Sequence, residues 1–249
     1  MIKGSEIRKA DFPIEPLLLN RWSPRAMSGE EIAEEELMRL FEAARWAPSS
    51  FNAQPWRTLY ARRGTEHWPM FFDLLVEANK SWAKNAAAVV VFISRKIFDH
   101  DGEPSKTHSY DTGAAWENFT LQGCRQGFVV HGMEGFDYER ARVEMRIPDE
   151  FHVEAMAAVG KPGPKELLPE KLQKRESPND RRKLTESICE GPFRFWSGDR
   201  TEGNEVNEEV SACKHSCKRF REMNTGVAVT DWRLRRVSLW IYTTPEVLI

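Results

Sequence analysis

The chain has 249 residues and a net charge of −2, with 41% hydrophobic and 30% charged residues, a composition that fits a globular protein of one large or two small domains. The balanced charge gives no electrostatic case for binding nucleic acid or an anionic membrane, and no apolar run is long enough to span a bilayer. Four cysteines do not make a disulfide framework and the first residues lack a signal-peptide pattern, so a cytoplasmic location is expected.

The hydrophobic pattern predicts helices and strands over the first 160 residues. Ser28 and Glu31 match a capping box, which predicts a helix from there to the residues before Pro48. Asp137 is the expected N-cap of a later helix. The unbroken, valine-rich run 86–94 is typical of a strand buried on both faces. The full set comprises further helices over 66–78, 111–126 and 137–145, and strands over 56–61, 86–94, 128–131 and 153–160.

Residues 161–183 have a different character. They hold four prolines, and their eight Lys and Arg outnumber four Asp and Glu. This composition predicts an extended, solvated connection. A brief return to order is expected over 184–195.

The first segment that carries chemistry is Arg21-Trp22-Ser23-Pro24-Arg25. It places two guanidiniums and a hydroxyl within five residues, and the forked donors of arginine match the oxygens of a phosphate. Taken alone, this segment is more typical of a solvated loop before a helix than of a phosphate site.

The second segment is the loop 47–57, which is held by prolines. Ser49, Ser50, Asn52 and Gln54 supply two hydroxyls and two amides. Because amides both donate and accept, this set suits the edge of a flat heterocycle. The two segments together predict a phosphorylated cofactor that carries a ring.

At these residues the chain resembles the FMN-dependent nitroreductase family. That family has an Arg-x-Ser-x-Arg phosphate segment, followed by a Pro-Ser-Ser-x-Asn-x-Gln-Pro-Trp loop beside the flavin. Three later segments match further motifs of the family in the same order. The resemblance covers about residues 15–195. The three segments are the Asn-x-x-Trp segment from Asn79, the turn Met133-Glu134-Gly135, and the basic pair Arg181 and Arg182. Either arginine of this pair could be the one that matches the family's phosphate-binding residue.

The resemblance implies an α+β fold, with a mainly antiparallel sheet flanked by helices, and an intertwined homodimer that binds FMN at its interface. Arg21, Trp22, Ser23, Arg25 and Arg181 or Arg182 would bind the phosphate, although Trp22 stands where a second arginine is common. Ser49, Ser50, Asn52, Gln54, Asn79 and the turn 133–135 would lie beside the ring.

The implied reaction is a two-electron, ping-pong hydride transfer from NAD(P)H through FMN to a nitroaromatic or quinone-like acceptor, with no catalytic side chain required. The sequence has no phosphate-binding P-loop and no Rossmann glycine pattern, so NAD(P)H would bind transiently. Two alternatives remain open: another flavin enzyme of the superfamily, such as a reductive dehalogenase or a flavin-fragmenting enzyme, and a non-catalytic flavin-binding protein. The segment from Cys213 to Cys217, with one histidine, is a poor zinc signature, so no metal is expected.

Residues 196–249 have no recognisable counterpart in the family. Their eight basic and eight acidic residues balance, and no sustained period appears before residues 237–242. We therefore expect a domain over 1–195 and a loosely packed or disordered extension over 196–249. Two alternatives are an altered reading frame, and docking of Trp232, Trp240 and residues 247–249 on the partner subunit.

Overall fold

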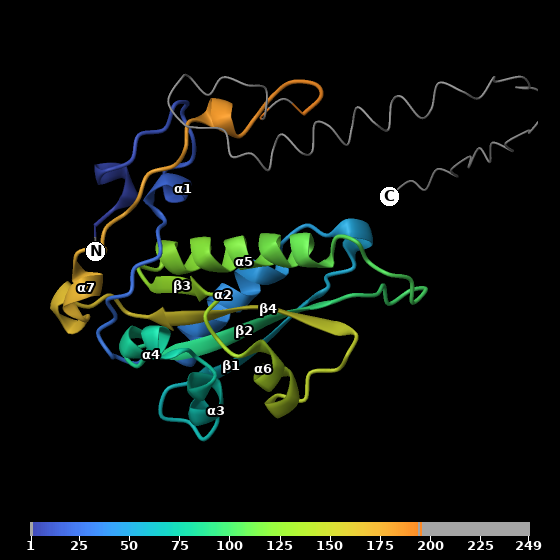
Figure 1. Cartoon of the computed structure of the whole chain (residues 1–249), viewed down its shortest axis with the longest axis horizontal. Coiled ribbons are helices and arrows are strands. Elements are labelled where there is room, and N and C mark those ends of the chain that lie inside the picture. Colours follow the sequence, from blue (N-terminus) through green and yellow to red (C-terminus); the bar gives the residue numbers. More distant parts are fainter. Residues whose placement is uncertain (1, 194, 196–249) are drawn as a thin grey trace, which may run out of the picture. The chain divides into compact units, whose positions relative to one another are not determined.

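One four-stranded antiparallel sheet forms the centre of the fold (Figure 1). The computed structural model describes residues 2–193 and 195, and a first compact unit ends at Ile188. In the first unit the strands follow the order β1-β2-β4-β3, and all neighbours pair antiparallel. The strands are β1 Trp56–Arg62, β2 Ala88–Arg95, β3 Val129–Met133 and β4 Phe151–Gly160.

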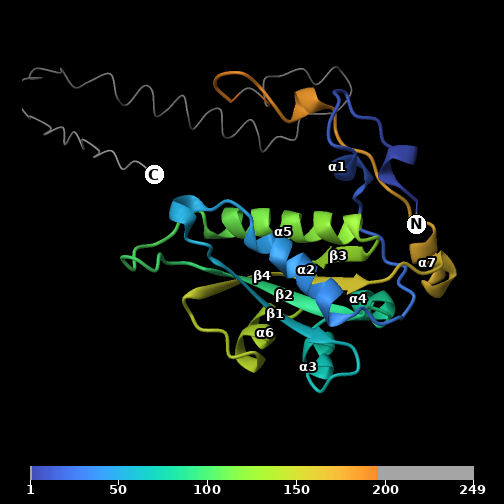
Figure 2. The same cartoon turned by 180° about the vertical axis from the view of Figure 1, so that it is seen from behind.

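Helices cover both faces of this sheet, as the front and back views show (Figures 1 and 2). One face carries α2 Glu34–Arg45 and the long α5 His108–Arg125. The other carries α3 Trp68–Asp73, α4 Glu77–Ala83 and α6 Tyr138–Glu144. Two short helices, α1 Pro16–Asn20 and α7 Glu170–Gln173, lie in the segments that lead into and out of this core. The predicted α+β class, with an antiparallel sheet flanked by helices, is confirmed.

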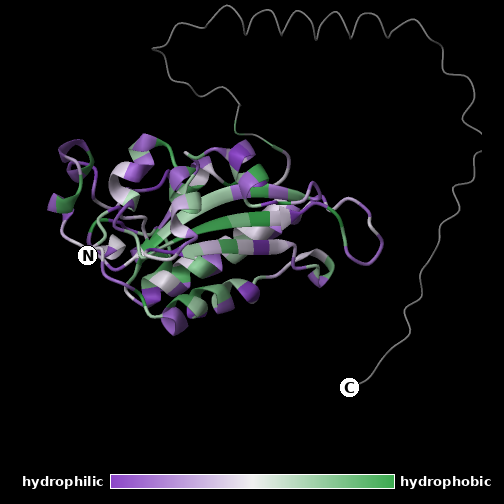
Figure 3. Ribbon diagram, turned by 90° about the horizontal axis from the view of Figure 1, so that it is seen from below, coloured by the Kyte–Doolittle hydropathy of each residue, from purple (hydrophilic) through white to green (hydrophobic). Residues whose placement is uncertain are grey.

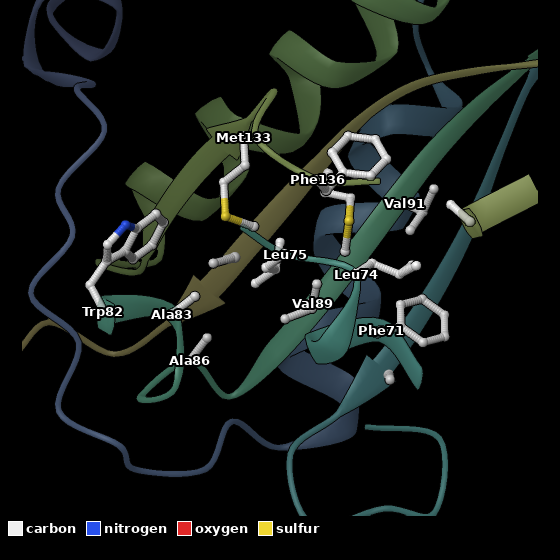
Figure 4. Packing of buried hydrophobic residues seen from close by; sticks show 14 of the residues in the cluster. Phe71, Leu74, Leu75, Trp82, Ala83, Ala86, Val89, Val91, Met133 and Phe136 are labelled. Atoms are coloured by element: carbon white, nitrogen blue, oxygen red, sulfur yellow. The ribbon is translucent and has the colours of Figure 1, made fainter. Parts of the chain in front are cut away.

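Strand β2 separates the two hydrophobic clusters, which explains why its sequence is apolar throughout. Val89 and Val91 pack into the cluster on the α3, α4 and α6 side, which Figure 4 shows at close range. Val90 and Phe92 point the opposite way, into the cluster that includes α2 and α5. In the hydropathy view the strands are largely hydrophobic, whereas hydrophilic segments recur along the helices (Figure 3). The prediction of a strand buried on both faces is confirmed.

The first helix begins later than its capping-box pattern predicted. α2 starts at Glu34, and Glu36 accepts a hydrogen bond from the Ala33 N–H at 3.2 Å. Ser28 instead accepts from the Glu30 N–H at 3.1 Å, within a turn. The backbone before this turn pairs with the chain around Pro162, so long-range pairing keeps it extended.

The helix predicted over 66–78 is two helices with a break between them. Between α3 and α4 the backbone turns toward residues far along the chain: the Val76 N–H donates to the Gly135 carbonyl at 3.1 Å, and the Asp137 N–H donates to the Leu74 carbonyl at 2.9 Å. These bonds compete with the helical ones and end α3. The separate helix α4, which places Asn79, was missed.

The remaining elements shift at their ends. Asp137 does cap α6, since its Oδ1 accepts from the Arg140 N–H at 2.9 Å. The connection 161–183 is less extended than predicted, because it holds α7 and a 3-10 turn over Lys165–Leu167. Another 3-10 turn, Leu184–Glu186, follows it. The expectations for residues 196–249, including Cys213 and Cys217, lie outside the described residues.

Candidate functional site

The segment Arg21–Arg25 runs between α5 and β3. The Arg21 Nε lies 3.3 Å from the Glu117 Oε1 on α5. On the other side, the His131 Nδ1 lies 2.9 Å from the Pro24 carbonyl oxygen, with the Ser23 carbonyl also beside the ring. The Trp22 indole N–H donates to the Ile2 carbonyl at 2.9 Å. The segment is therefore fixed at several points along its length.

Arg8, which sequence reasoning missed, links this segment by hydrogen bonds to Asn179, a residue distant in the sequence. Its side chain is buried, with 7% exposed. Nη1 donates to the Arg21 carbonyl at 2.6 Å and to the Leu19 carbonyl at 3.1 Å, and Nε donates to the Asn179 carbonyl at 2.6 Å. Nothing in the local pattern around Arg8 predicts a contact with a residue 171 positions away.

Three guanidiniums gather at this point: those of Arg8, Arg21 and Arg181. Burial lowers the pKa of Arg8, and the positive charges of Arg181 and Arg21 lower it further. The Arg21 Nε is buried and makes no well-aligned hydrogen bond among the described residues, although the Glu117 carboxylate lies 3.3 Å from it. Clustered guanidiniums suit an anion, because a phosphate would reduce their mutual repulsion and accept further hydrogen bonds. Arg182 is exposed and makes no hydrogen bond or ion pair within the described part of the chain.

Glu176 is a second residue that the sequence did not reveal. Its Oε1 accepts from the backbone N–H groups of Arg25 at 2.7 Å and Ala26 at 2.8 Å. Burial lowers the pKa of the half-buried Arg25, and the Glu176 carboxylate opposes this shift. Glu176 thus fixes the backbone at Arg25 from the C-terminal side of the domain.

Strand β3 connects the arginine cluster to the turn Met133-Glu134-Gly135. β3 is an edge strand, and His131 near its middle contacts the Arg21–Arg25 segment while the turn follows its end. Asn79 meets this turn, because its Nδ2 donates to the Gly135 carbonyl at 3.0 Å. A Cβ at position 135 would lie 2.9 Å from that same Nδ2, so the close approach requires glycine. We call the arginine cluster, the Arg21–Arg25 segment, the turn and Asn79 the β3 site.

The loop Ser49–Gln54 lies elsewhere, at the N-terminal end of α5. The buried Asp111 holds it, since its Oδ2 accepts from the Ser50 N–H at 3.1 Å. Arg21 contacts α5 at Glu117 instead, about 9 Å further along the helix axis for six residues. Figures 1 and 2 show the same separation: the loop before β1 lies at one end of α5 and α1 toward the other.

The backbone of this loop is strained. Phe51, Asn52 and Gln54 have φ angles of 52°, 53° and 47°, the left-handed region that non-glycine residues rarely adopt. The bonds that hold it include one from the Gln54 N–H to the Ser49 Oγ at 3.0 Å. Such strain persists where the surroundings enforce it, and it concentrates at functional sites.

A cavity of about 450 Å³ opens beside the turn. Met133 and Glu134 line it together with Trp116 of α5, Tyr138 of α6 and Glu154 of β4. Its volume falls in the range of small-molecule sites, and its walls combine aromatic surface with a few polar groups. The β3 site therefore has clustered cationic side chains at one end, and a hollow of small-molecule size adjoins its turn at the other end.

Comparison with known proteins identifies the family of the chain. Residues 18–79 match the model of the nitroreductase family. The chain is 44% identical to a solved structure described as an oxidoreductase containing FMN, covering 96% of that chain and 75% of this one with a TM-score of 0.73. The chain belongs to the nitroreductase family.

Weaker matches fit this membership. A nitroreductase family protein from Clostridium difficile 630 shares the fold at 20% identity, with a TM-score of 0.55, over 97% of that chain and 71% of this one. An uncharacterized 15.4 kDa protein of Mycolicibacterium smegmatis is 29% identical over 118 residues, which is 76% of that protein and 46% of this one. Within the described part of this nitroreductase-family chain, no helix is long and apolar enough to cross a membrane.

Proposed function

We propose that this protein is an FMN-dependent oxidoreductase that takes electrons from NAD(P)H and reduces nitroaromatic or quinone-like acceptors. The observation that carries the proposal is the cluster of the Arg8, Arg21 and Arg181 guanidiniums at one end of the β3 site. The FMN-containing relative, which aligns over nearly its whole length, supports the choice of cofactor.

Each part of the β3 site would have its own task. Arg21, Ser23, Arg25 and Arg181 would hold the phosphate, while Arg8 and Glu176 fix the backbone on either side of it. Asn79 and the backbone of Glu134 and Gly135 would meet the edge of the ring, where fixed donors stabilise added negative charge. When bound, FMN would supply reversible two-electron hydride chemistry.

We further propose that the protein acts as a homodimer. Ser49, Ser50, Asn52 and Gln54 lie on a different part of α5 from the β3 site, so a second copy could bring its loop to the ring. Trp46, Phe51 and Tyr110 in or near this loop are 73%, 82% and 82% exposed. Exposed aromatic side chains of this size are typical of surfaces that another chain covers.

We also propose that residues 1–195 form the FMN-binding domain and that residues 196–249 are dispensable for it. Truncation after Phe195 tests this directly. A soluble, flavin-binding, active dimer is expected, whereas loss of flavin or of the dimer would show that the extension is structural.

The absorption spectrum tests the main proposal. The purified protein should be yellow, and its flavin bands should bleach when NADH or NADPH is added without oxygen, then return with an acceptor. Colourless protein that fails to take up added FMN would refute the cofactor. A bound flavin that neither donor reduces would favour a non-catalytic flavin protein, and a monomeric mass with intact activity would refute the dimer.

A further inference from the structure

Glu154 places a fixed carboxylate in the wall of the 450 Å³ cavity. Its side chain is 20% exposed. Oε1 accepts from the Ser109 Oγ at 2.7 Å and, through a short hydrogen bond, from the buried Ser94 Oγ. Oε2 makes no hydrogen bond among the described residues, and the His152 Nε2 lies 3.9 Å from it, beyond hydrogen-bond distance. One oxygen is therefore locked in place and the other retains its capacity to accept.

Thr112 independently points to a ligand in the same cavity. It lines the hollow from α5, and only 2% of it is exposed. Its Oγ1 is buried and has no partner among the described residues. A buried hydroxyl without a hydrogen bond is costly. A ligand that reached this oxygen would remove that cost.

Among carboxylate, lysine and arginine side chains, those that line the cavity have one sign. Two histidines, His108 at 3.7 Å and His152 at 3.9 Å, lie near Glu154 but do not line the cavity. Glu134 lines it as well as Glu154, and no lysine or arginine does so among the described residues. Burial raises the pKa of Tyr138, and the negative charges of Glu134 and Glu154 raise it further. The remaining wall is largely apolar, with the rings of Phe92 and Trp116 on one side.

We propose that this cavity receives the electron acceptor and selects flat aromatic acceptors that are neutral or cationic, excluding anionic ones. Aromatic walls would hold the ring, Thr112 would bond a polar substituent, and Glu154 would accept from a donor and repel a negative group. The inference rests on the proposed function, since it names the acceptor class for that activity. The anionic phosphate of the cofactor would lie at the arginine cluster, outside this negative region.

Three para-substituted nitrobenzenes of similar size and different charge test the proposal: 4-nitrobenzylammonium, 4-nitrobenzyl alcohol and 4-nitrobenzoate. Binding to the oxidised full-length protein, as purified and without an electron donor, is measured by titration calorimetry. The ammonium and the alcohol should bind at least about tenfold more tightly than the benzoate, which corresponds to about 1.4 kcal/mol. The ratios of kcat/KM should follow the same order.

Two variants test whether Glu154 causes the charge preference and whether Thr112 binds the polar substituent. Glu154→Gln should bring the ammonium and benzoate affinities within about threefold of each other, and Thr112→Val should weaken the alcohol severalfold without changing the charge preference. Asp149→Asn, which removes a fully exposed carboxylate, is the matched control and should leave the ratios unchanged.

Equal affinities of the wild type for the ammonium and the benzoate would overturn the proposal, whether or not Glu154→Gln folds. A preference that survives in a folded variant carrying both Glu154→Gln and Glu134→Gln would overturn it too. FMN uptake and donor bleaching are measured on the same samples. A flavin protein that reacts but shows no charge preference refutes only this inference, whereas failure to bind flavin refutes the proposed function.

Discussion

His131 should make the stability of the fold depend on pH. Its ring packs against Trp82, with centroids 4.7 Å apart, and its Nδ1 lies 2.9 Å from the Pro24 carbonyl oxygen. Because a carbonyl only accepts, this nitrogen carries the proton of the neutral ring. Burial and the charge of Arg25 lower the pKa of His131 from 6.5 to about 4.

The direction and size of this pH dependence follow from the difference in proton binding at His131 between the folded and unfolded chains. Between pH 6.5 and 4 the unfolded chain binds a proton at His131 that the folded chain does not, so stability falls as the pH is lowered through this window. Above pH 6.5 the contribution is complete, and below about pH 4 the loss is complete. A difference of about 2.5 pH units is worth up to about 3 kcal/mol, a large part of the total stability of a typical domain.

The substitution His131→Asn separates this charge effect from the hydrogen bond, since an asparagine amide can donate to the same carbonyl but does not titrate. Urea unfolding at pH 7, 6, 5 and 4.5 gives the free energy of unfolding of each protein. The wild type should lose about 2 kcal/mol more than the variant between pH 7 and 5. The exposed His67, replaced by Asn, is the control. Equal pH dependence in the wild type and His131→Asn would refute the reasoning.

Further substitutions test the two ends of the β3 site. Arg21→Ala should weaken FMN binding about ten- to hundredfold, because a charge-assisted bond contributes about 1.5–3 kcal/mol; Arg62→Ala, outside the site, should not, and equal dissociation constants would count against the assignment. Gly135→Ala should destabilise the fold by about 1–3 kcal/mol, since its Cβ would lie 2.9 Å from the Asn79 Nδ2. Gly113→Ala, with open space around its Cβ inside α5, should leave the melting temperature unchanged or raise it; a Gly135→Ala variant as stable as this control would contradict the close packing.

The sequence determined the elements whose information is local. The apolar run that became β2 is hydrophobic at every position, because both of its faces are covered, and this pattern is readable without a structure. Asp137 marks the start of α6 because a cap is made within one helical turn. The family could likewise be recognised from short motifs, since the loop Ser49–Gln54 keeps its residues in a fixed order.

Elements that depend on distant partners could not be read in this way. The helix predicted over 66–78 breaks because Leu74 and Val76 bond to residues 135–137, and no local pattern records that pairing. Ser28 resembled a helix cap, but the neighbouring backbone pairs with residues near Pro162 instead. In both cases hydrogen bonds to remote backbone outweigh local preference, which is worth only a fraction of a kcal/mol per residue.

The α+β class, the central strand and the residue types suited to a phosphate and a ring could thus be predicted without a structure. How these residues are grouped depends on contacts between segments that are distant in the sequence. The tertiary structure placed Arg8 and Arg181 beside Arg21, and it left the loop Ser49–Gln54 at another part of α5. The physical reason is that a buried guanidinium needs acceptors wherever the fold supplies them, and Arg8 finds its acceptors in segments that are far apart in sequence.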